Sequence, residues 1–313
     1  MRVSHVLALL LCAIPCAALA QQPALQSLPT EKVTVTAPSQ IPDAVLHDFI
    51  KSYTAASPAS GKVARWRTGI CPITAGLPQT ANKLITDRVR QVAALVTAPV
   101  GTAETCKPNI DIVFTLNPQV LLDQVRTKTP VLLGYHDVAQ EKDLATVSRP
   151  VQAWYTTQTV DLHGVTYVDD KLRNHGGFYT VSPFGPKYGN IFIPDARVTN
   201  VTGSHLGDGV SSELYHVIVI VDLSKVDGRT LGALADYIAM LSLAQTQAFG
   251  VCQPVASITN LVSAPCDGAV QAKSITANDL AYLHGLYRID PRKSFQEQQS
   301  DIAYEMKKGP EQR

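Results

Sequence analysis

A strand-like run followed by an apolar helix constrains the fold of this 313-residue chain more than any other feature. Residues 213–222, ELYHVIVIVD, have the β-branched composition of a strand. Residues 231–245, LGALADYIAMLSLAQ, follow, and Asp236 and Ser242 are the only strongly polar residues between 231 and 244. A helix that is apolar on all sides lies inside its domain. We therefore expect a buried helix shortly after this strand.

The surrounding pattern predicts one α+β domain over residues 61–292, within the size that a single core supports. Its periodicity indicates a mixed sheet and several helices. The expected helices cover 81–96 and 119–126, and the expected strands cover 109–115, 151–164, 165–170 and 196–203, with a hairpin joining 151–164 to 165–170.

Both ends of the chain predict separate segments. Residues 1–20 have one cation, an apolar middle and small residues before Gln21, which is typical of a signal peptide cleaved near Ala20 and Gln21. Residues 21–60 predict a flexible leader with a strand at KVTVT and a short helix at 43–53. Residues 293–313 predict a helical tail. We expect a periplasmic or secreted protein with no membrane insertion, because no later apolar run approaches the ~20 residues needed to cross a bilayer.

The charge balance argues against several classes of partner. The chain has 27 basic and 26 acidic residues, and removing residues 1–20 removes Arg2 and no acid, which leaves 26 of each. Binding to nucleic acid or to anionic lipid needs clustered cations. We therefore expect no nucleic-acid partner.

Four cysteines remain after signal-peptide cleavage, and an even number in an exported chain predicts disulfides. Three pairings are possible. We favour the local ones, each worth ~3 kcal/mol. The alternative, a zinc site, lacks any CxxC pair. The local pairs are Cys71 with Cys106 and Cys252 with Cys266.

Four segments in order resemble metzincin-type zinc proteases. Residues 274–280, SITANDL, followed by Leu283 and Leu286-Tyr287, resemble their terminal helix with its Ser/Thr-x-x-Asp cap. Residues 256–260, ASITN, fall where those proteins have the Met-turn, and 217–222 with 234–244 fall at their edge strand and zinc helix. The order also resembles a secreted proteobacterial family of unknown function. The resemblance covers about residues 61–292 and implies a zincin-like fold.

The expected zinc helix departs from the family at every position that does chemistry. A zinc helix needs HExxH, with two histidines as ligands and a glutamate that polarises the bound water. Asp236 and Met240 stand at the two histidine positions, Tyr237 at the glutamate position and Thr246 at the third-ligand position. We expect this helix to hold no zinc, and we assign no catalytic residue, cofactor or metal.

Two other groups of residues are candidates for a site. Histidines and aspartates in predicted loops offer metal ligands if they converge, although none has helical i, i+4 spacing. These are His136, His163, His175, His205 and His216, with Asp137, Asp169 and Asp170. The Gly- and Pro-rich loop 175–192 offers aromatic rings for binding, although the same rings could serve only to hold the loop against the core. Its candidates are His175, Phe178, Tyr179, Phe184 and Tyr188.

From the sequence we expect an exported, non-catalytic, zincin-like pseudo-peptidase scaffold that binds an unknown envelope partner or ligand in the former cleft. The alternative is an exported hydrolase with a metal site built from His175, His205, His216 and Asp236. A third possibility, an envelope structural or transporter-associated protein, would act through the leader.

Overall fold

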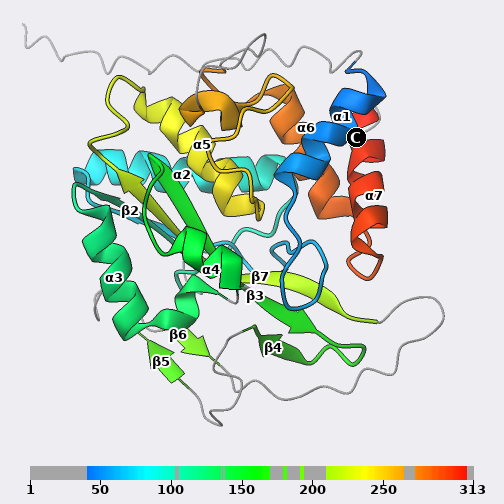
Figure 1. Ribbon diagram of the computed structural model, residues 1–313, viewed down its shortest axis with the longest axis horizontal. Coiled ribbons are helices and arrows are strands. Elements are labelled where there is room, and N and C mark those ends of the chain that lie inside the picture. The colour runs from blue at the N-terminus through cyan, green and yellow to red at the C-terminus, as the bar shows by residue number, and fades with distance from the viewer. Residues whose placement is uncertain are drawn as a thin grey trace, which may run out of the picture. The chain divides into compact units, whose positions relative to one another are not determined.

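The computed structural model describes residues 41–102, 106–134, 136, 138–169, 179–181, 191–193, 209–263 and 272–308. These residues form an α+β fold with seven α-helices and a five-stranded mixed sheet (Figure 1). The α-helices are α1 (Asp43–Tyr53), α2 (Gln79–Leu95), α3 (Pro118–Lys128), α4 (Val138–Leu144), α5 (Leu231–Leu243), α6 (Ala277–Arg288) and α7 (Phe295–Lys307). The 3-10 helices are η1 (Pro130–Leu133) and η3 (Ile258–Val262).

The large sheet has the strand order β1-β2-β7-β3-β4. Its strands are β1 (Pro72–Ala75), β2 (Ile110–Thr115), β3 (Val151–Val160), β4 (Thr166–Val168) and β7 (Ser211–Asp222). β1, β2 and β7 run parallel, and β3 runs antiparallel to both β7 and β4. The predicted hairpin is confirmed as β3 and β4.

β7 is buried on both faces. Val217, Val219 and Val221 belong to a large core that also contains α5, whereas Ile218 and Ile220 belong to a smaller core with residues of α3 and η1. Successive strand side chains point to opposite faces, so the run of β-branched residues supplies both cores. The sheet therefore separates a thick helical layer from a thin one.

The thick layer contains α5, and α2 packs against α5 (Figure 1). α6 packs against α7, and α7 contacts α1. Leu46, Phe49, Ile50 and Tyr53 of α1 are buried in this core. The helix predicted at 43–53 is therefore present, and it belongs to the domain although the sequence placed it in the leader.

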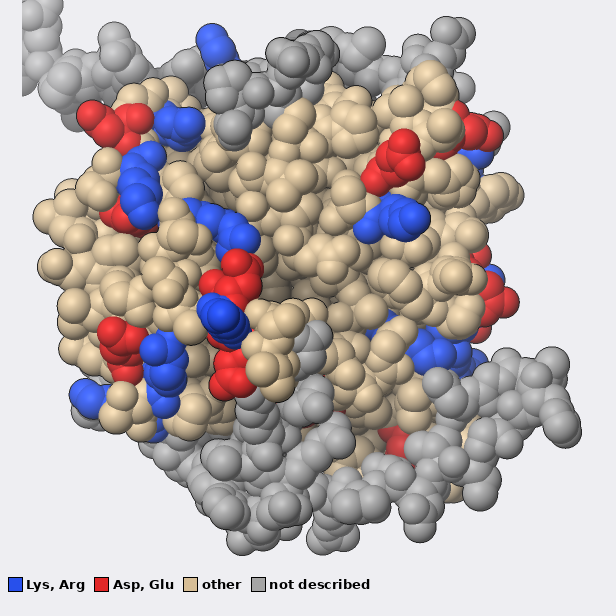
Figure 2. All heavy atoms as spheres, viewed as in Figure 1, with Lys and Arg blue, Asp and Glu red and all other residues tan. Residues whose placement is uncertain are grey.

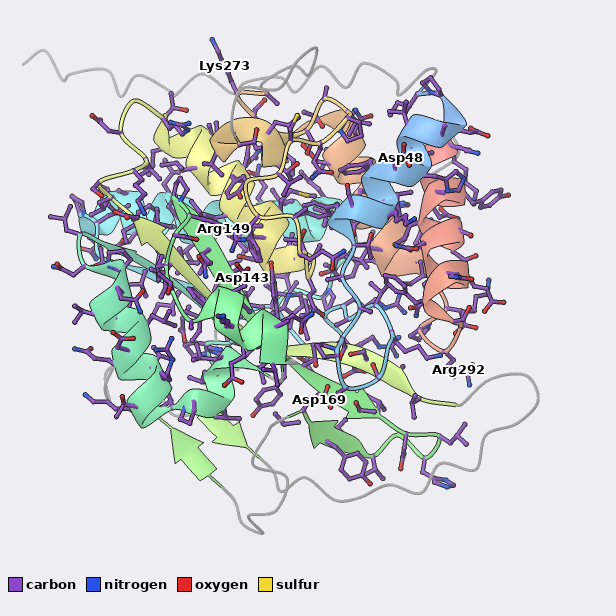
Figure 3. The ribbon with its side chains drawn as sticks, viewed as in Figure 1. Asp48, Asp143, Arg149, Asp169, Lys273 and Arg292 are labelled. Atoms are coloured by element: carbon purple, nitrogen blue, oxygen red, sulfur yellow. A yellow bond between two sulfur atoms is a disulfide. The ribbon has the colours of Figure 1, made fainter. Side chains whose placement is uncertain are left out.

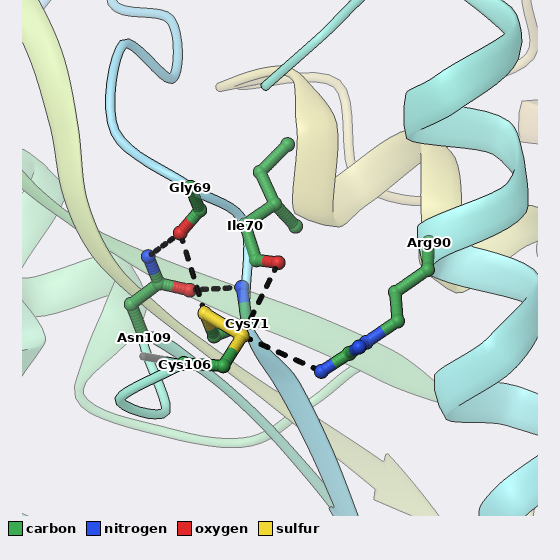
Figure 4. Close-up of a disulfide and its surroundings, with 6 residues drawn as sticks. All are labelled: Gly69, Ile70, Cys71, Arg90, Cys106 and Asn109. Atoms are coloured by element: carbon green, nitrogen blue, oxygen red, sulfur yellow. Dashed lines mark hydrogen bonds between the residues drawn. A yellow bond between two sulfur atoms is a disulfide. The ribbon is translucent and has the colours of Figure 1, made fainter. Parts of the chain in front are cut away.

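A disulfide joins Cys71, just before β1, to Cys106, just before β2, which confirms this predicted pairing (Figure 4). The side chain of Asn109 holds the same strand entry, accepting from the Cys71 N–H at 2.8 Å and donating to Gly69 O at 3.0 Å. The bond closes a separation of 35 residues, and chain entropy gives such a bridge about 4 kcal/mol. Cys252 is disulfide-bonded as well. Its predicted partner, Cys266, lies outside the described residues.

Two short strands, β5 (Tyr179–Val181) and β6 (Ile191–Ile193), pair antiparallel inside the segment predicted as an aromatic loop. The predicted strand 196–203 lies outside the described residues. None of the helices in the described part of the chain is both long enough and apolar enough to span a bilayer.

Candidate functional site

The helix α5 is enclosed, as the sequence predicts. Every residue from Ala233 to Leu243 is buried, including Asp236, Tyr237 and Met240, which the sequence resemblance aligned with a zinc-binding motif. Thr230 caps the helix, accepting from the Ala233 N–H at 3.2 Å. The helix α5 therefore lies in the interior of the fold.

The polar groups at these positions are bonded to protein. Asp236 forms an ion pair with Arg88 of α2 and accepts from the Ile275 N–H at 2.8 Å. Thr246 donates to Tyr53 O at 2.7 Å, and the backbones of Thr246 and Thr54 form an antiparallel bridge. Both groups hold neighbouring segments onto α5, so neither is available to coordinate a metal without breaking those contacts.

Tyr237 belongs to a group of residues around Arg149. Burial raises the pKa of Tyr237, and the positive charge of Arg149 partly opposes this rise. The Arg149 guanidinium carbon lies 5.4 Å from the centre of the Phe249 ring, a cation–π distance. Phe249 in turn stacks on Tyr155 of β3 with ring centroids 6.3 Å apart. We call Arg149, Tyr155, Tyr237 and Phe249 the Arg149 cluster.

The Arg149 cluster lies at a hollowed part of the molecular face. Figure 2 shows a depression beside a row of charged side chains, and Figure 3 labels Arg149 and Asp143 at this place. Asp143 of α4 accepts from Arg149 Nη2 at 3.2 Å. The sequence did not single out Arg149, Asp143 or Phe249. The one signal was a cation two residues before the predicted strand, which by itself is not specific.

The outer edge of β3 begins two residues after Arg149, and over the first seven residues of β3 no strand of the described part of the chain pairs with it. β4 pairs only with Gln158–Val160. The Asp222 N–H donates to Pro150 O. Hydrogen-bonded positions alternate along an antiparallel pair, so the even-numbered residues of β3 from 150 to 156 direct their N–H and C=O groups toward β7. The backbone groups of Val151, Ala153 and Tyr155 therefore point away from the sheet.

The chain between η1 and β3 covers this edge. Gly134, with φ of +78°, lies so close to the Tyr155 carbonyl oxygen that a Cβ would be only 2.0 Å from it. Further along, Leu144 O accepts from Trp154 Nε1 and Thr146 O accepts from Gln152 Nε2, both at 3.3 Å. The odd-numbered edge residues are buried, so a new strand reaches them only if this covering segment moves.

Asp279 joins the 3-10 helix η3 to the start of α6. Its carboxylate accepts from Ser257 Oγ, the Ile258 N–H and the Thr276 N–H, which links η3 to the start of α6. Thr276 and Asp279 form the predicted capping box. Burial raises the pKa of Asp279, while these hydrogen bonds oppose the rise.

Three of the five candidate histidines lie in the described part of the chain, and they are not gathered. His163 is in the turn between β3 and β4, and His136 Nε2 lies 2.7 Å from Leu133 O. His216 is inside β7, not in a loop, where its Nε2 lies 3.0 Å from Asp111 Oδ2 in a buried pair. Within the described ranges no three His, Cys, Asp or Glu residues group as a metal site. His175 and His205 lie outside them.

Asp169 is buried, and its hydrogen bonds stabilise the hairpin of β3 and β4. Its carboxylate accepts from Thr157 Oγ1 at 2.6 Å and Thr159 Oγ1 at 2.8 Å. Asp137 and Asp170 lie outside the described residues. Of the predicted binding loop, Tyr179 begins β5. The other four candidates, His175, Phe178, Phe184 and Tyr188, also lie outside the described residues.

No protein-family model, curated protein or solved structure matches this chain. The structure defines an α+β protein with a buried central helix, α5. The Arg149 cluster lies beside this helix, at the covered edge of β3.

Proposed function

We propose that this chain is an exported, non-catalytic scaffold of zincin-like descent that binds a partner in the cleft beside α5 and β3. The observation that carries the proposal is the enclosure of α5. Each position that would hold a metal or its general base is buried, and Asp236 and Thr246 are bonded to neighbouring segments.

The order of elements supports the zincin-like part of the proposal. β7 leads into α5, a turn-like 3-10 helix follows at the expected Met-turn, and a capped helix follows that. Asp279 ties the last two together through Ser257 and Ile258. The Cys71–Cys106 disulfide supports an extracytoplasmic location, since such bonds persist in oxidising compartments.

The binding part of the proposal rests on β3. An edge strand with free outward-pointing backbone groups is a template for an added strand. Gly134 lies against the Tyr155 carbonyl at this edge, and the chain from Gly134 to β3 contains α4, in which no residue is buried. We infer that a partner in extended conformation pairs with this edge when the covering segment moves.

A second candidate function is a hydrolase whose metal site is built from histidines and aspartates. The observation that favours it is the buried pair of His216 and Asp111, because a carboxylate that orients an imidazole is common to metal ligands and general bases. The pair is enclosed in the sheet, and it has to be opened before it can reach a substrate.

Two measurements on the purified full-length protein separate these functions. Elemental analysis after dialysis against zinc, and hydrolysis of denatured casein, test the enzyme. We expect substoichiometric metal and no cleavage. One bound transition metal per chain, or cleavage that His216→Ala abolishes, contradicts the scaffold proposal.

Binding is tested with a phage-displayed library of random 12-residue peptides. We expect selection on the wild-type protein and loss of selection with Ala153→Pro, because proline removes the outward N–H of residue 153 and no hydrogen bond of the β3–β7 ladder. Unchanged selection with this variant contradicts pairing at the edge. Leu162→Pro in the β3–β4 turn is the control for proline itself.

A further inference from the structure

Arg149 has hydrogen-bonding capacity that the protein leaves unused. Its Nη2 donates to Asp143, but the second terminal nitrogen, Nη1, is buried and has no hydrogen-bond partner among the described residues. A buried donor without an acceptor is destabilising because it has lost its hydrogen bond to water. The Phe249 ring holds the guanidinium in place. A planar guanidinium held in this way is suited to bind a carboxylate with two hydrogen bonds.

The present partner of Arg149 is weakly held. Asp143 is on α4, and 62 % of its side chain is exposed. The seven-residue helix α4 has no buried residue, and Val138 at its start is 83 % exposed. An exposed ion pair contributes little to stability, because water screens its charges. Replacing Asp143 by another carboxylate therefore has a small energetic penalty.

We propose that the Arg149 cluster is a carboxylate-binding site for an extended acidic partner, and that Asp143 occupies it as an intramolecular competitor until the partner binds. This inference rests on the proposed function, because it assigns the chemistry of the partner that pairs with β3. It also assigns a role to α4, which covers the strand edge and carries the competing carboxylate.

We take the partner strand to run antiparallel to β3, as β4 and β7 do, and the position of Arg149 then places the carboxylate within the partner. Arg149 is two residues before Val151, at the amino-terminal end of β3. A strand that pairs antiparallel with β3 has its own carboxyl-terminal end at this point. The carboxylate that reaches Arg149 thus belongs to the partner's C-terminus or to an acidic side chain close to the end of its paired segment.

The test uses three pools of fluorescently labelled eight-residue peptides with random Val, Thr, Ser and Ala positions. One pool ends in a free carboxylate, one has a C-terminal amide and glutamate at its last position, and one has the amide and no acid. Binding to the full chain is followed by fluorescence anisotropy. We expect at least one acidic pool to bind about tenfold more tightly than the neutral pool, and the better of the two identifies the source of the carboxylate.

Variants assign this preference to the Arg149 cluster. Arg149→Gln removes it, and Arg149→Lys retains part of it because charge remains while the planar fork is lost. Asp143→Asn strengthens acidic binding a few-fold by removing the competitor. Asp123→Asn is the matched control, since Asp123 forms a similar exposed pair with Arg126 on α3.

The outcomes distinguish this inference from the proposed function. Equal binding of all three pools, or an acidic preference that survives Arg149→Gln in a protein with an unchanged thermal unfolding midpoint, overturns the carboxylate site and leaves strand pairing standing. Absence of binding by every pool, to the wild type and to Asp143→Asn, overturns both.

Discussion

Two helices associated with the β3 region, α5 and α4, differ in almost every physical property. α5 is buried from Ala233 to Leu243 and its one carboxylate is paired inside the protein. α4 buries no residue and its Asp143 forms an exposed pair. The comparison teaches that α5 supports the fold through its burial, whereas α4, which buries no residue, is the helix to which we assign the response to a partner.

The largest expected difference concerns apolar side chains. Ile238→Ala in α5 should lower the free energy of unfolding by about 3–4 kcal/mol, because Ile238 is fully buried and the deletion leaves a cavity. Val138→Ala in α4 should change it by less than about 0.5 kcal/mol. Urea unfolding followed by circular dichroism measures both. Equal effects for the two variants would contradict the comparison.

The second-largest expected effect concerns Asp236, the buried carboxylate of α5. Asp236→Ala should destabilise by about 2–3 kcal/mol, below the ~3–5 kcal/mol of a fully enclosed pair, because 21 % of the Arg88 side chain is exposed. Asp87→Ala is the control, since it breaks an exposed pair with Lys83 on the same helix α2. The same urea titration reports both, and a loss under 1 kcal/mol for Asp236→Ala would show that the pair is not structural.

Alkaline pH tests the burial of Tyr237 in α5. Burial raises the pKa of Tyr237 above its usual value near 10, so the folded state keeps a proton that the unfolded state releases. This contribution is fully present below pH 10 and is lost as pH rises beyond it, by ~1.4 kcal/mol per pH unit. Tyr237→Phe should reduce the slope of stability against pH by that amount. Tyr304→Phe, on the exposed face of α7, is the control for removing a tyrosine hydroxyl outside the core.

The smallest expected effect concerns the connection from α4 to β3. Gln119 of α3 donates to Ala145 O at 3.2 Å and accepts from the Val147 N–H at 2.9 Å. Gln119→Ala should cost about 1 kcal/mol and should raise the rate of amide hydrogen exchange in residues 138–147. Gln124→Ala on the same helix is the control, because Gln124 is exposed. Identical exchange in the two variants would show that α3 does not restrain this segment.

Much of the fold was predictable because local patterns report burial. The apolar run at 231–245, the β-branched run at 217–221 and the Thr276 cap each contain their own signal, and each appears as expected. The Cys71–Cys106 pairing followed from an even cysteine count and a preference for local bridges. These features depend on residues within one element, or on covalent chemistry.

The candidate site was less predictable, since its members come from separate elements. Nothing near Arg149 in the sequence indicates Phe249 or Tyr237, which reach it only after α5 packs beside β3. For His216 the sequence suggested a site that the structure does not form. We expected this histidine among loop ligands, but it lies inside β7 and pairs with Asp111.

By itself the sequence determined that α5 is interior and lacks a zinc-binding motif, because side-chain chemistry and helical period are properties of the chain alone. Only the tertiary structure decided that α1 belongs to the core. It also decided that Arg88 pairs with Asp236, 148 residues further along the chain, and that Asp143 pairs with Arg149. The reason is physical: an ion pair or a strand edge depends on distances between elements, and those distances are set by how the whole core packs.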